Sequence, residues 1–431
     1  MRAVVLFTRD LRVHDNPALA AAAREADEVV PLFVHDPAIE RTFGAPRRRA
    51  FLLESLHDLR SSLGGALAVR HGDPVRVALA LGPDAVYLSS DVSATAQRRE
   101  AALRGAVDVR AFPGVTVVPT GAPVPAGGDH YRVFTPYHRA WLGEPWRRAE
   151  DAPRALRLPP DVETGGLPAV GRDPALPAGG ETAGRRAMRA WLSGGLAAYD
   201  EERDRLDANA TSRLSPYLHF GCLSPLELAR EALARGGHGF VRQLAWRDFY
   251  AQLLRARPET RDDDLRPRGD RWNDDPDGLA AWTEGLTGYP LVDAGMRQLA
   301  AEGWLHNRAR LVTASFLVKH LYVDWREGAR AYEDRLVDGD VANNRGNWQW
   351  VAGTGVDQRP NRVYNPTLQA LRHDPSGAYV RRYVPELADL PAETIHEPWR
   401  LGADGLRRLG YPPPIVDHAE AVRRFRTARG R

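Results

Sequence analysis

The N-terminal fold is set by the stretch AVVLFTRD, residues 3–10. Five consecutive apolar residues closed by a polar cluster are typical of a strand that is buried on both faces of a sheet. Asp15 or Asn16 can cap the helix that follows, with Pro17 in its first turn. A buried strand followed by a helix is the first half of a βαβ unit.

The same pattern repeats along the first part of the chain. Four further short apolar strands are expected at Val29–Val34, Leu67–Val69, Ala85–Leu88 and Val107–Ala111. Helical stretches such as Arg47–Leu63 and Ala94–Arg104 separate them. Strands that alternate with helices predict an α/β domain built on a doubly wound parallel sheet.

Polar clusters follow these strands, at Thr8-Arg9-Asp10, His35-Asp36, His71-Gly72-Asp73 and Ser89-Ser90-Asp91. Ligands of such sheets lie outside the carboxyl ends of the strands, so the clusters are candidates for a small-molecule pocket. Ordinary polar loops explain them equally well. No Gly-x-Gly-x-x-Gly follows the first strand, so a dinucleotide site of the Rossmann type is not supported.

Beyond the alternating region, a Pro- and Gly-rich stretch without periodicity extends to about Gly180. After Glu181 the strand pattern ends and helical spacing takes over. We therefore expect an α/β domain over residues 1–130, an interdomain linker over 131–180 and a larger all-α domain over 181–431.

The bulk numbers of this 431-residue chain are those of an ordinary globular protein, with 43% hydrophobic residues and a net charge of only +3. The single cysteine, Cys222, excludes an internal disulfide and any multi-cysteine metal site. We expect no metal, no membrane contact, a cytoplasmic location and a monomer. The chain has one lysine, Lys319, so its basic side chains are nearly all arginine, the side chain that forks onto phosphate.

Two segments of the helical part carry residues suited to a ligand. In TSRLSP, residues 211–216, Ser215 before Pro216 begins a helix, and hydroxyls with free N–H groups there suit a phosphate or merely cap the helix. In QLAWRDFY, residues 243–250, one helical face combines Gln243, Trp246, Arg247 and Tyr250. Such a face forms either core or the wall of a ligand site.

Three later segments add polar and aromatic groups: GWLHNRAR at 303–310, DGDVANNRGNWQW at 338–350 and NPTLQ at 365–369. The paired Asp338 and Asp340 suggest a metal site, although no further carboxylate or histidine cluster is near in sequence. They equally suit the role of orienting arginines such as Arg310.

Taken in order, these motifs resemble those of the photolyase and cryptochrome family, in particular the cyclobutane pyrimidine dimer photolyases of class I type. TGYP with VDA (287–294), DWREG (324–328) and the opening FTRDLR (7–12) agree with the same family. The resemblance covers nearly the whole chain and implies an all-α FAD-binding domain behind the α/β domain.

The resemblance implies FAD contacts for twelve residues. The phosphate side would be Tyr199, Thr211, Ser212, Arg213, Leu214 and Ser215, and the isoalloxazine and ribityl side Arg247, Arg310, Asp338, Gly339, Asp340 and Asn344. Asn344 resembles the residue that faces flavin N5. A neutral amide there tolerates both flavin charge states, whereas a carboxylate would disfavour the anionic reduced form.

The reaction implied by the family is light-driven repair of UV-damaged DNA, in which an electron from reduced FAD splits a dimer flipped out of the duplex. Trp246 and Trp350 resemble the indoles that hold the dimer. Other expected DNA or substrate contacts are Arg203, Gln243, Asn307, Arg308, Arg362 and Gln369. Trp272, Trp325 and Trp348 match the family's electron-transfer tryptophans, so these three, Gln243 and Asn344 are the catalytic candidates.

The α/β domain of the family holds a light-harvesting pigment. Asp36 and Arg48 fall where members that bind a deazaflavin place pigment contacts, and methenyltetrahydrofolate is the alternative.

Two other activities of the family remain open. Gln243 stands where many dimer photolyases have Glu and six-four photolyases commonly have Gln. Six-four photolyases, however, place proton-donating histidines where this chain has Asn307 and Leu311. A light-signalling cryptochrome is the second alternative, against which the neutral Asn344 argues, because plant members carry an acidic residue and animal members usually a cysteine there.

Overall fold

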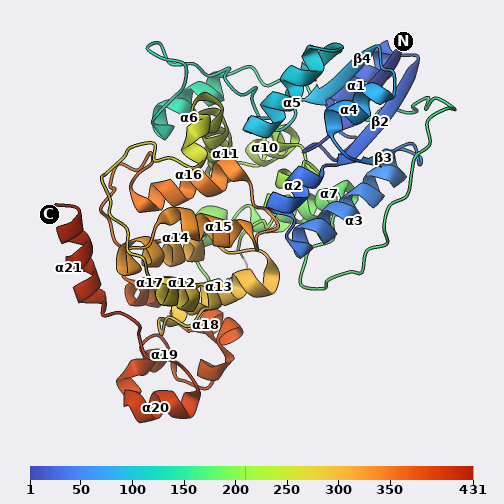
Figure 1. Cartoon of the computed structure of the whole chain (residues 1–431). Coiled ribbons are helices and arrows are strands. Elements are labelled where there is room, and N and C mark those ends of the chain that lie inside the picture. Colours follow the sequence, from blue (N-terminus) through green and yellow to red (C-terminus); the bar gives the residue numbers. More distant parts are fainter. Residues whose placement is uncertain (209, 431) are drawn as a thin grey trace. The chain divides into compact units, whose positions relative to one another are not determined.

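The computed structural model describes residues 1–208 and 210–430, which form two compact units. Unit 1 comprises residues 1–199 and 212–259, and unit 2 comprises residues 200–211 and 260–431. The described part of unit 1 contains a parallel sheet with helices, whereas the described part of unit 2 is helical (Figure 1).

The five strands of unit 1 confirm the predicted doubly wound sheet. All neighbours pair in parallel, and the strand order is β3-β2-β1-β4-β5. The strands are β1 (Arg2–Phe7), β2 (Glu28–His35), β3 (Ala68–His71), β4 (Ala85–Ser89) and β5 (Asp108–Phe112). Each lies within one or two residues of its predicted apolar run. Strands β1, β2 and β4 are buried along most of their length, which requires continuous apolar sequence.

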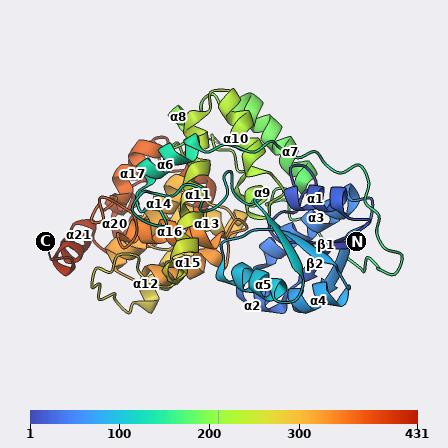
Figure 2. The same ribbon diagram turned by 90° about the horizontal axis from the view of Figure 1, so that it is seen from above.

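Helices cover both faces of this sheet, with α1 and α3 on one face and α4 and α5 on the other (Figure 2). The helices between strands are α1 (Pro17–Glu25), α2 (Pro37–Phe43), α3 (Pro46–Ser62), α4 (Pro74–Ala80) and α5 (Ala94–Arg104). Of the two expected caps, Asn16 is the one that caps α1, since its side chain accepts a hydrogen bond from Leu19 N, and Pro17 is the first helical residue.

Further helices of the chain group with the sheet in unit 1. They are α6 (Phe134–Gly143), α7 (Glu181–Ala190), α9 (Ser215–His219), α10 (Pro225–Ala234) and α11 (His238–Ala256), with a π-helical turn over Trp191–Gly195. Helix α6 lies inside the segment expected to be a linker and packs against α11. Residues 144–180 contain neither helix nor strand. The domain boundaries proposed from the sequence stay a prediction.

The core of unit 2 is built from α12 to α18 around buried apolar residues such as Trp282, Phe316 and Trp325. The helices that lie wholly in this unit are α12 (Pro276–Glu284), α13 (Pro290–Glu302), α14 (Asn307–Ser315), α15 (Trp325–Glu333), α16 (Val341–Ala352), α17 (Pro366–His373), α18 (Ala378–Tyr383), α19 (Ala392–Ile395), α20 (Gly402–Leu409) and α21 (His418–Ala428). Helix α8 (Tyr199–Glu202) lies where the chain passes between the units. Across residues 1–208 and 210–430, no helix is long and apolar enough to cross a membrane.

Candidate functional site

In unit 2, one of the two paired aspartates, Asp338, binds an arginine. Arg310 donates from Nη2 to both carboxylate oxygens of Asp338, at 3.0 and 2.9 Å, and from Nε to the Leu305 carbonyl. Asp340 caps α16 by accepting from Asn343 N. Among the described residues, no group of three or more His, Cys, Asp and Glu could hold a metal ion. Of the two roles left open by the sequence, the orientation of Arg310 is supported for Asp338, whereas Asp340 serves as a helix cap.

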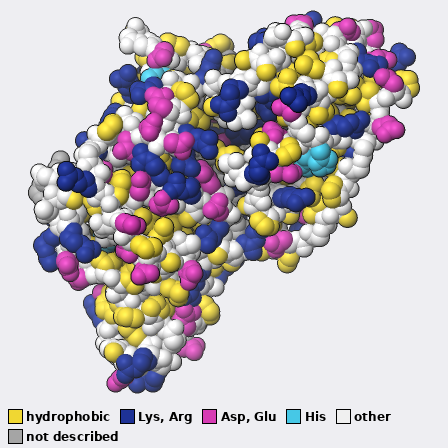
Figure 3. Space-filling view, viewed as in Figure 1, with side chains coloured by type: hydrophobic (Ala, Val, Ile, Leu, Met, Phe, Trp, Pro, Cys, Tyr) yellow, Lys and Arg dark blue, Asp and Glu magenta, His cyan; other side chains and the backbone are white. Residues whose placement is uncertain are grey.

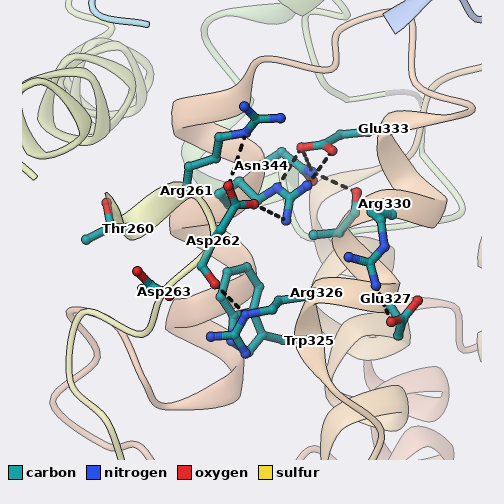
Figure 4. A network of polar contacts seen from close by, with 12 residues as sticks. Thr260, Arg261, Asp262, Asp263, Trp325, Arg326, Glu327, Arg330, Glu333 and Asn344 are labelled. Carbon is teal, nitrogen blue, oxygen red and sulfur yellow. Dashed lines mark hydrogen bonds and ion pairs between the residues drawn. The ribbon is translucent and has the colours of Figure 1, made fainter. Parts of the chain in front are cut away.

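Asn344 lies on α16 and is 93% buried, with only 7% of its surface exposed. Its Nδ2 donates to the Ala329 carbonyl at 3.0 Å and to Oε1 of Glu333 at 3.2 Å. Figure 4 shows Asn344 and Glu333 within a larger polar network that also includes Asp262 and Arg326. Within the described chain, no donor is found for Oδ1 of Asn344. The predicted cofactor residue therefore keeps an open acceptor in a buried position.

The three candidate tryptophans of electron transfer differ in exposure. Trp325 and Trp348 are buried, on the adjoining helices α15 and α16, and Trp272 is half-buried outside them. Among the described residues, no ring contact joins any two of the three. A Cβ at Gly328 would collide with the Trp348 ring, so glycine in DWREG is required for the close approach of α15 to this indole. Their role as a relay stays a prediction.

Several expected DNA contacts meet one another in unit 2. Arg308 forms a 2.7 Å ion pair with Asp204, and its Nη1 lies 3.4 Å from Oε1 of Gln369. Burial raises the pKa of Asp204, but the hydrogen bond from Arg308 and the nearby positive charges, chiefly that of Arg308, together outweigh burial and leave that pKa lowered. The guanidinium of Arg362 lies over the Trp350 ring at 5.0 Å. Arg203 lies near Asp200, and Asn307 is exposed as the first residue of α14.

The single lysine of the chain, Lys319, binds the backbone of the loop that carries Arg362. Lys319 is 2% exposed, and its Nζ donates to the carbonyls of Pro360 and Arg362 at 3.2 and 2.5 Å. Burial lowers the pKa of Lys319 to about 7. On the face of unit 2 seen in Figure 3, basic and acidic side chains are interleaved, so charge alone does not mark a DNA surface there.

In unit 1, the aromatic face of α11 is supported by α6. The rings of Trp246 and Phe134 are stacked at 3.7 Å, and Tyr250 lies 5.7 Å from Trp246. Arg247 donates to the carbonyls of Val115 and Leu218, and Gln243 is half-buried. One ring face of Trp246 is thus covered by Phe134. A tryptophan can pack against the core with one face and contact a ligand with the other.

Asp248 is the residue of this helix that sequence reasoning did not assign. It is buried and accepts from Val117 N and Trp141 Nε1, both at 2.9 Å. Burial raises the pKa of Asp248 to about 6, although Arg247 and these hydrogen bonds lower it. Asp248 therefore connects α11 to α6, through Trp141, and to the loop after β5, through Val117.

The predicted phosphate segment is irregular up to Ser215, and from Ser212 onward it belongs to unit 1. Arg213 has a positive φ of 51°, and Ser212 Oγ accepts from Leu214 N at 3.4 Å. Helix α9 begins at Ser215, as expected, but Leu214 occupies the capping position and makes no side-chain cap bond. Tyr199 packs edge-on against Trp191 and Phe240. Thr211 belongs to unit 2. Phosphate binding by these residues stays a prediction.

At the carboxyl edge of the sheet, the expected pigment contacts have structural partners. Asp36 caps α2 by accepting from Ala38 N, and Arg48 is buried and donates to the Phe43 carbonyl. Within the described residues, the side-chain atoms without a partner at this edge include Thr8 Oγ1 and His35 Nε2, both buried. Sequence reasoning placed these two in the polar clusters but did not single them out, since it cannot tell which polar atoms find partners.

Family models match both parts of the chain. The model described as DNA photolyase matches residues 3–157, and that of the FAD binding domain of DNA photolyase matches residues 240–430. The chain is 54% identical to a deoxyribodipyrimidine photo-lyase of Streptomyces griseus, over 99% of each chain. This chain belongs to the DNA photolyase family.

Solved structures of the family share the fold of this photolyase-family chain. A class III photolyase from Agrobacterium tumefaciens has a TM-score of 0.92 and 36% identity, over 100% of this chain and 97% of its own. A cryptochrome from Synechocystis has a TM-score of 0.91 and 29% identity, over 99% of each chain. The family is therefore established, whereas the fold alone does not separate a repair photolyase from a cryptochrome.

Proposed function

We propose that this chain repairs cyclobutane pyrimidine dimers in DNA under blue light, with FAD as its cofactor. The match to a deoxyribodipyrimidine photo-lyase over 99% of both chains supports the repair activity. The FAD-binding family model and the open acceptor at Asn344 support the cofactor.

The residues of unit 2 fit a flavin. Oδ1 of Asn344 is an acceptor that no donor among the described residues occupies, and Trp348 Nε1, one helical turn away, is a buried donor without a partner there. Buried polar atoms are rarely left unpaired, so the Trp348 N–H is a candidate contact for a polar ligand, as is the open acceptor of Asn344. We assign the flavin-holding role in unit 2 to Arg310, Asp338, Gly339, Asp340 and Asn344.

Bound FAD supplies light absorption and one-electron transfer. The chain's own residues bind and orient: Arg310 is fixed by Asp338, and Asn344 offers a neutral amide that does not oppose negative charge on a reduced cofactor. Trp246 and Trp350 each offer an indole face on which an extrahelical pyrimidine can stack. Thr211 and residues 212–215, with Tyr199, are proposed to serve the phosphate side of the cofactor, and Arg247 is proposed to serve its isoalloxazine and ribityl side.

The choice of cyclobutane dimers over six-four products rests on the start of α14. Neither Asn307 nor Leu311 can donate a proton as an acid. The neighbouring His306 is buried, and its Nδ1 accepts from Arg308 N as the cap of α14. A histidine committed to a helix cap is poorly placed for general acid catalysis. Splitting a cyclobutane ring needs no acid.

A light-dependent repair assay on defined oligonucleotides tests this proposal, with one cyclobutane dimer or one six-four product each and dark samples as controls. We expect repair of the dimer alone. Gln243→Glu should keep this activity, and Gln243→Leu should lower affinity because thymine polar groups lose their partner. Efficient six-four repair would overturn the lesion assignment. An FAD-loaded protein that repairs neither lesion would favour a cryptochrome-type role, which the Synechocystis structure keeps open.

A further inference from the structure

A buried ion pair lies directly behind Asn344. Arg345 donates from Nε to Oε1 of Glu333 at 2.8 Å and from Nη2 to Oε2 at 2.7 Å. The side chains of Arg345 and Glu333 are 5% and 9% exposed, and Asp262 is the next carboxylate, 3.7 Å from Nη1 of Arg345. Figure 4 shows Asn344, Glu333 and Asp262 in the same polar network. The fork geometry is the strongest form of an arginine–carboxylate contact.

The same carboxylate fixes the direction of the Asn344 amide. The two neighbours of the Asn344 side chain are the Ala329 carbonyl and Oε1 of Glu333. Both accept hydrogen bonds, so the NH₂ end of the amide must point toward them. The amide oxygen then points the other way, where no donor of the described chain meets it. The helix alone would leave the amide free to turn over.

The negative charge of Glu333 is balanced by the positive charge of Arg345. A carboxylate one contact away from a flavin would disfavour the negative charge that a reduced flavin carries. Arg345, which forks onto both oxygens, cancels that charge at the carboxylate itself. The pair can therefore orient the amide without placing a net charge behind it.

We propose that Glu333 and Arg345 are positioning residues for the cofactor: Glu333 holds the Asn344 amide with its oxygen presented to an N–H of the flavin, and Arg345 neutralises Glu333. This inference rests on the proposed function, because it takes FAD as the ligand beside Asn344. Neither residue is required to touch the cofactor, the substrate or DNA.

The test uses equilibrium redox titration of the FAD-loaded full-length protein. Arg345→Met leaves the carboxylate without its cation, so the flavin potential should fall. Glu333→Gln leaves the arginine without its anion, so the potential should rise. Each change should alter the ratio of reduced to oxidised flavin at least tenfold at a fixed solution potential, which is about 30 mV for a two-electron couple. The double variant restores neutrality and should return within about threefold of the wild type.

A matched control is the pair formed by Arg429 and Asp270, which is also buried and bidentate, with side chains 4% and 1% exposed. Asp270→Asn should destabilise the protein as Glu333→Gln does, yet change the flavin ratio less than twofold. Nitrogen-15 NMR of protein loaded with labelled FAD gives a second readout: Glu333→Leu should move the N5 resonance of reduced flavin, because the amide is no longer held.

FAD content and thermal unfolding are measured for every variant first. If Arg345→Met does not fold, Arg345→Lys replaces it: lysine keeps the charge and loses the fork, so the potential should stay near that of the wild type while the N5 resonance shifts. Shifts of the same sign in Arg345→Met and Glu333→Gln, or no shift in Glu333→Gln, would overturn the inference and leave the proposed function intact. A wild-type protein that binds no FAD would instead overturn the proposed function.

Discussion

At the carboxyl edge of the sheet in unit 1, the residues expected to bind a ligand are engaged by the protein, whereas on α16 of unit 2 the expected residue keeps an open acceptor. Asp36 caps α2 and Asp10 accepts from Thr8 N and Ser89 Oγ. Asn344, by contrast, is bonded to the described part of the chain through its NH₂ end alone. In both regions the charges find internal partners, and neutral atoms such as Thr8 Oγ1 and Asn344 Oδ1 remain for a ligand.

This contrast has a physical reason. A buried charge without a partner costs several kcal/mol, so a stable fold pairs its charges with one another. An unpaired neutral group costs about 1–3 kcal/mol, which a fold can carry at a site that a ligand later fills. The unpaired neutral groups are therefore the better guide to a binding site than the conspicuous aspartates.

The largest effect is expected in unit 2, when the ion pair between Arg310 and Asp338 is removed. Arg310→Met leaves Asp338 buried without its cation, and we expect a loss of about 3 kcal/mol in stability together with at least a tenfold loss of bound FAD. Denaturant unfolding and the flavin-to-protein absorbance ratio measure the two quantities. Arg297→Met, which breaks the more exposed pair with Glu386, is the control and should retain FAD. Full FAD content in Arg310→Met would contradict the assignment.

The next prediction compares how the stability of the protein changes with pH because of one buried ionisable group in each unit. The pKa of Asp248 in unit 1 is raised to about 6, so the folded state keeps a proton that the unfolded state loses, and stability should fall between about pH 4 and 6. The pKa of Lys319 in unit 2 is lowered to about 7, so stability should rise from about pH 7 toward 10. Each change should be on the order of 3 kcal/mol.

Denaturant unfolding across the pH range checks these slopes, with Asp248→Asn and Lys319→Met as the variants that should each lose one of them. If Asp248→Asn keeps the full decrease between pH 4 and 6, other carboxylates are responsible, and the same reasoning applies to Lys319→Met at high pH.

A smaller effect concerns the two indoles proposed to hold the lesion. Trp246→Ala and Trp350→Ala should each weaken binding of dimer-containing DNA by about 1–3 kcal/mol, because base stacking is lost. Phe at either position should recover most of the affinity. Phe134→Ala should weaken binding as well, since Trp246 loses the ring stacked on it. Fluorescence anisotropy with damaged and undamaged duplexes measures this, and equal losses on both duplexes would show that the indoles do not recognise the lesion.

The smallest effects are expected at the carboxyl edge of the sheet, where Asp36 is bonded within the protein and Thr8 Oγ1 has no partner among the described residues. Asp36→Ala removes a helix cap and should cost about 1 kcal/mol, whereas Thr8→Val removes an unpaired buried hydroxyl and should not destabilise the protein. We propose a pigment beside Thr8 and His35, so Thr8→Val should weaken uptake of an added deazaflavin or methenyltetrahydrofolate more than Asp36→Ala does. Quenching of pigment fluorescence measures uptake, and the reverse order would favour Asp36 over Thr8 as the contact.

The amino-acid sequence by itself determined the parallel sheet and the start of many helices. Buried strands need continuous apolar residues, and caps such as Asn16 with Pro17 act within one turn, so both signals are local. The motifs were also sufficient to identify the family, because their order is visible in the sequence itself.

Only the tertiary structure decided which polar groups are satisfied. Glu333 and Arg345 are 12 positions apart on two helices, and Phe134 lies 112 positions before Trp246, so no local spacing predicts either contact. The helix inside the expected linker was missed for the same reason: α6 is stabilised by packing on α11 rather than by its own capping, since Val133 makes no side-chain cap bond. Hydrogen bonding between distant residues is a property of the packed chain, and it is this property that leaves the amide oxygen of Asn344 open.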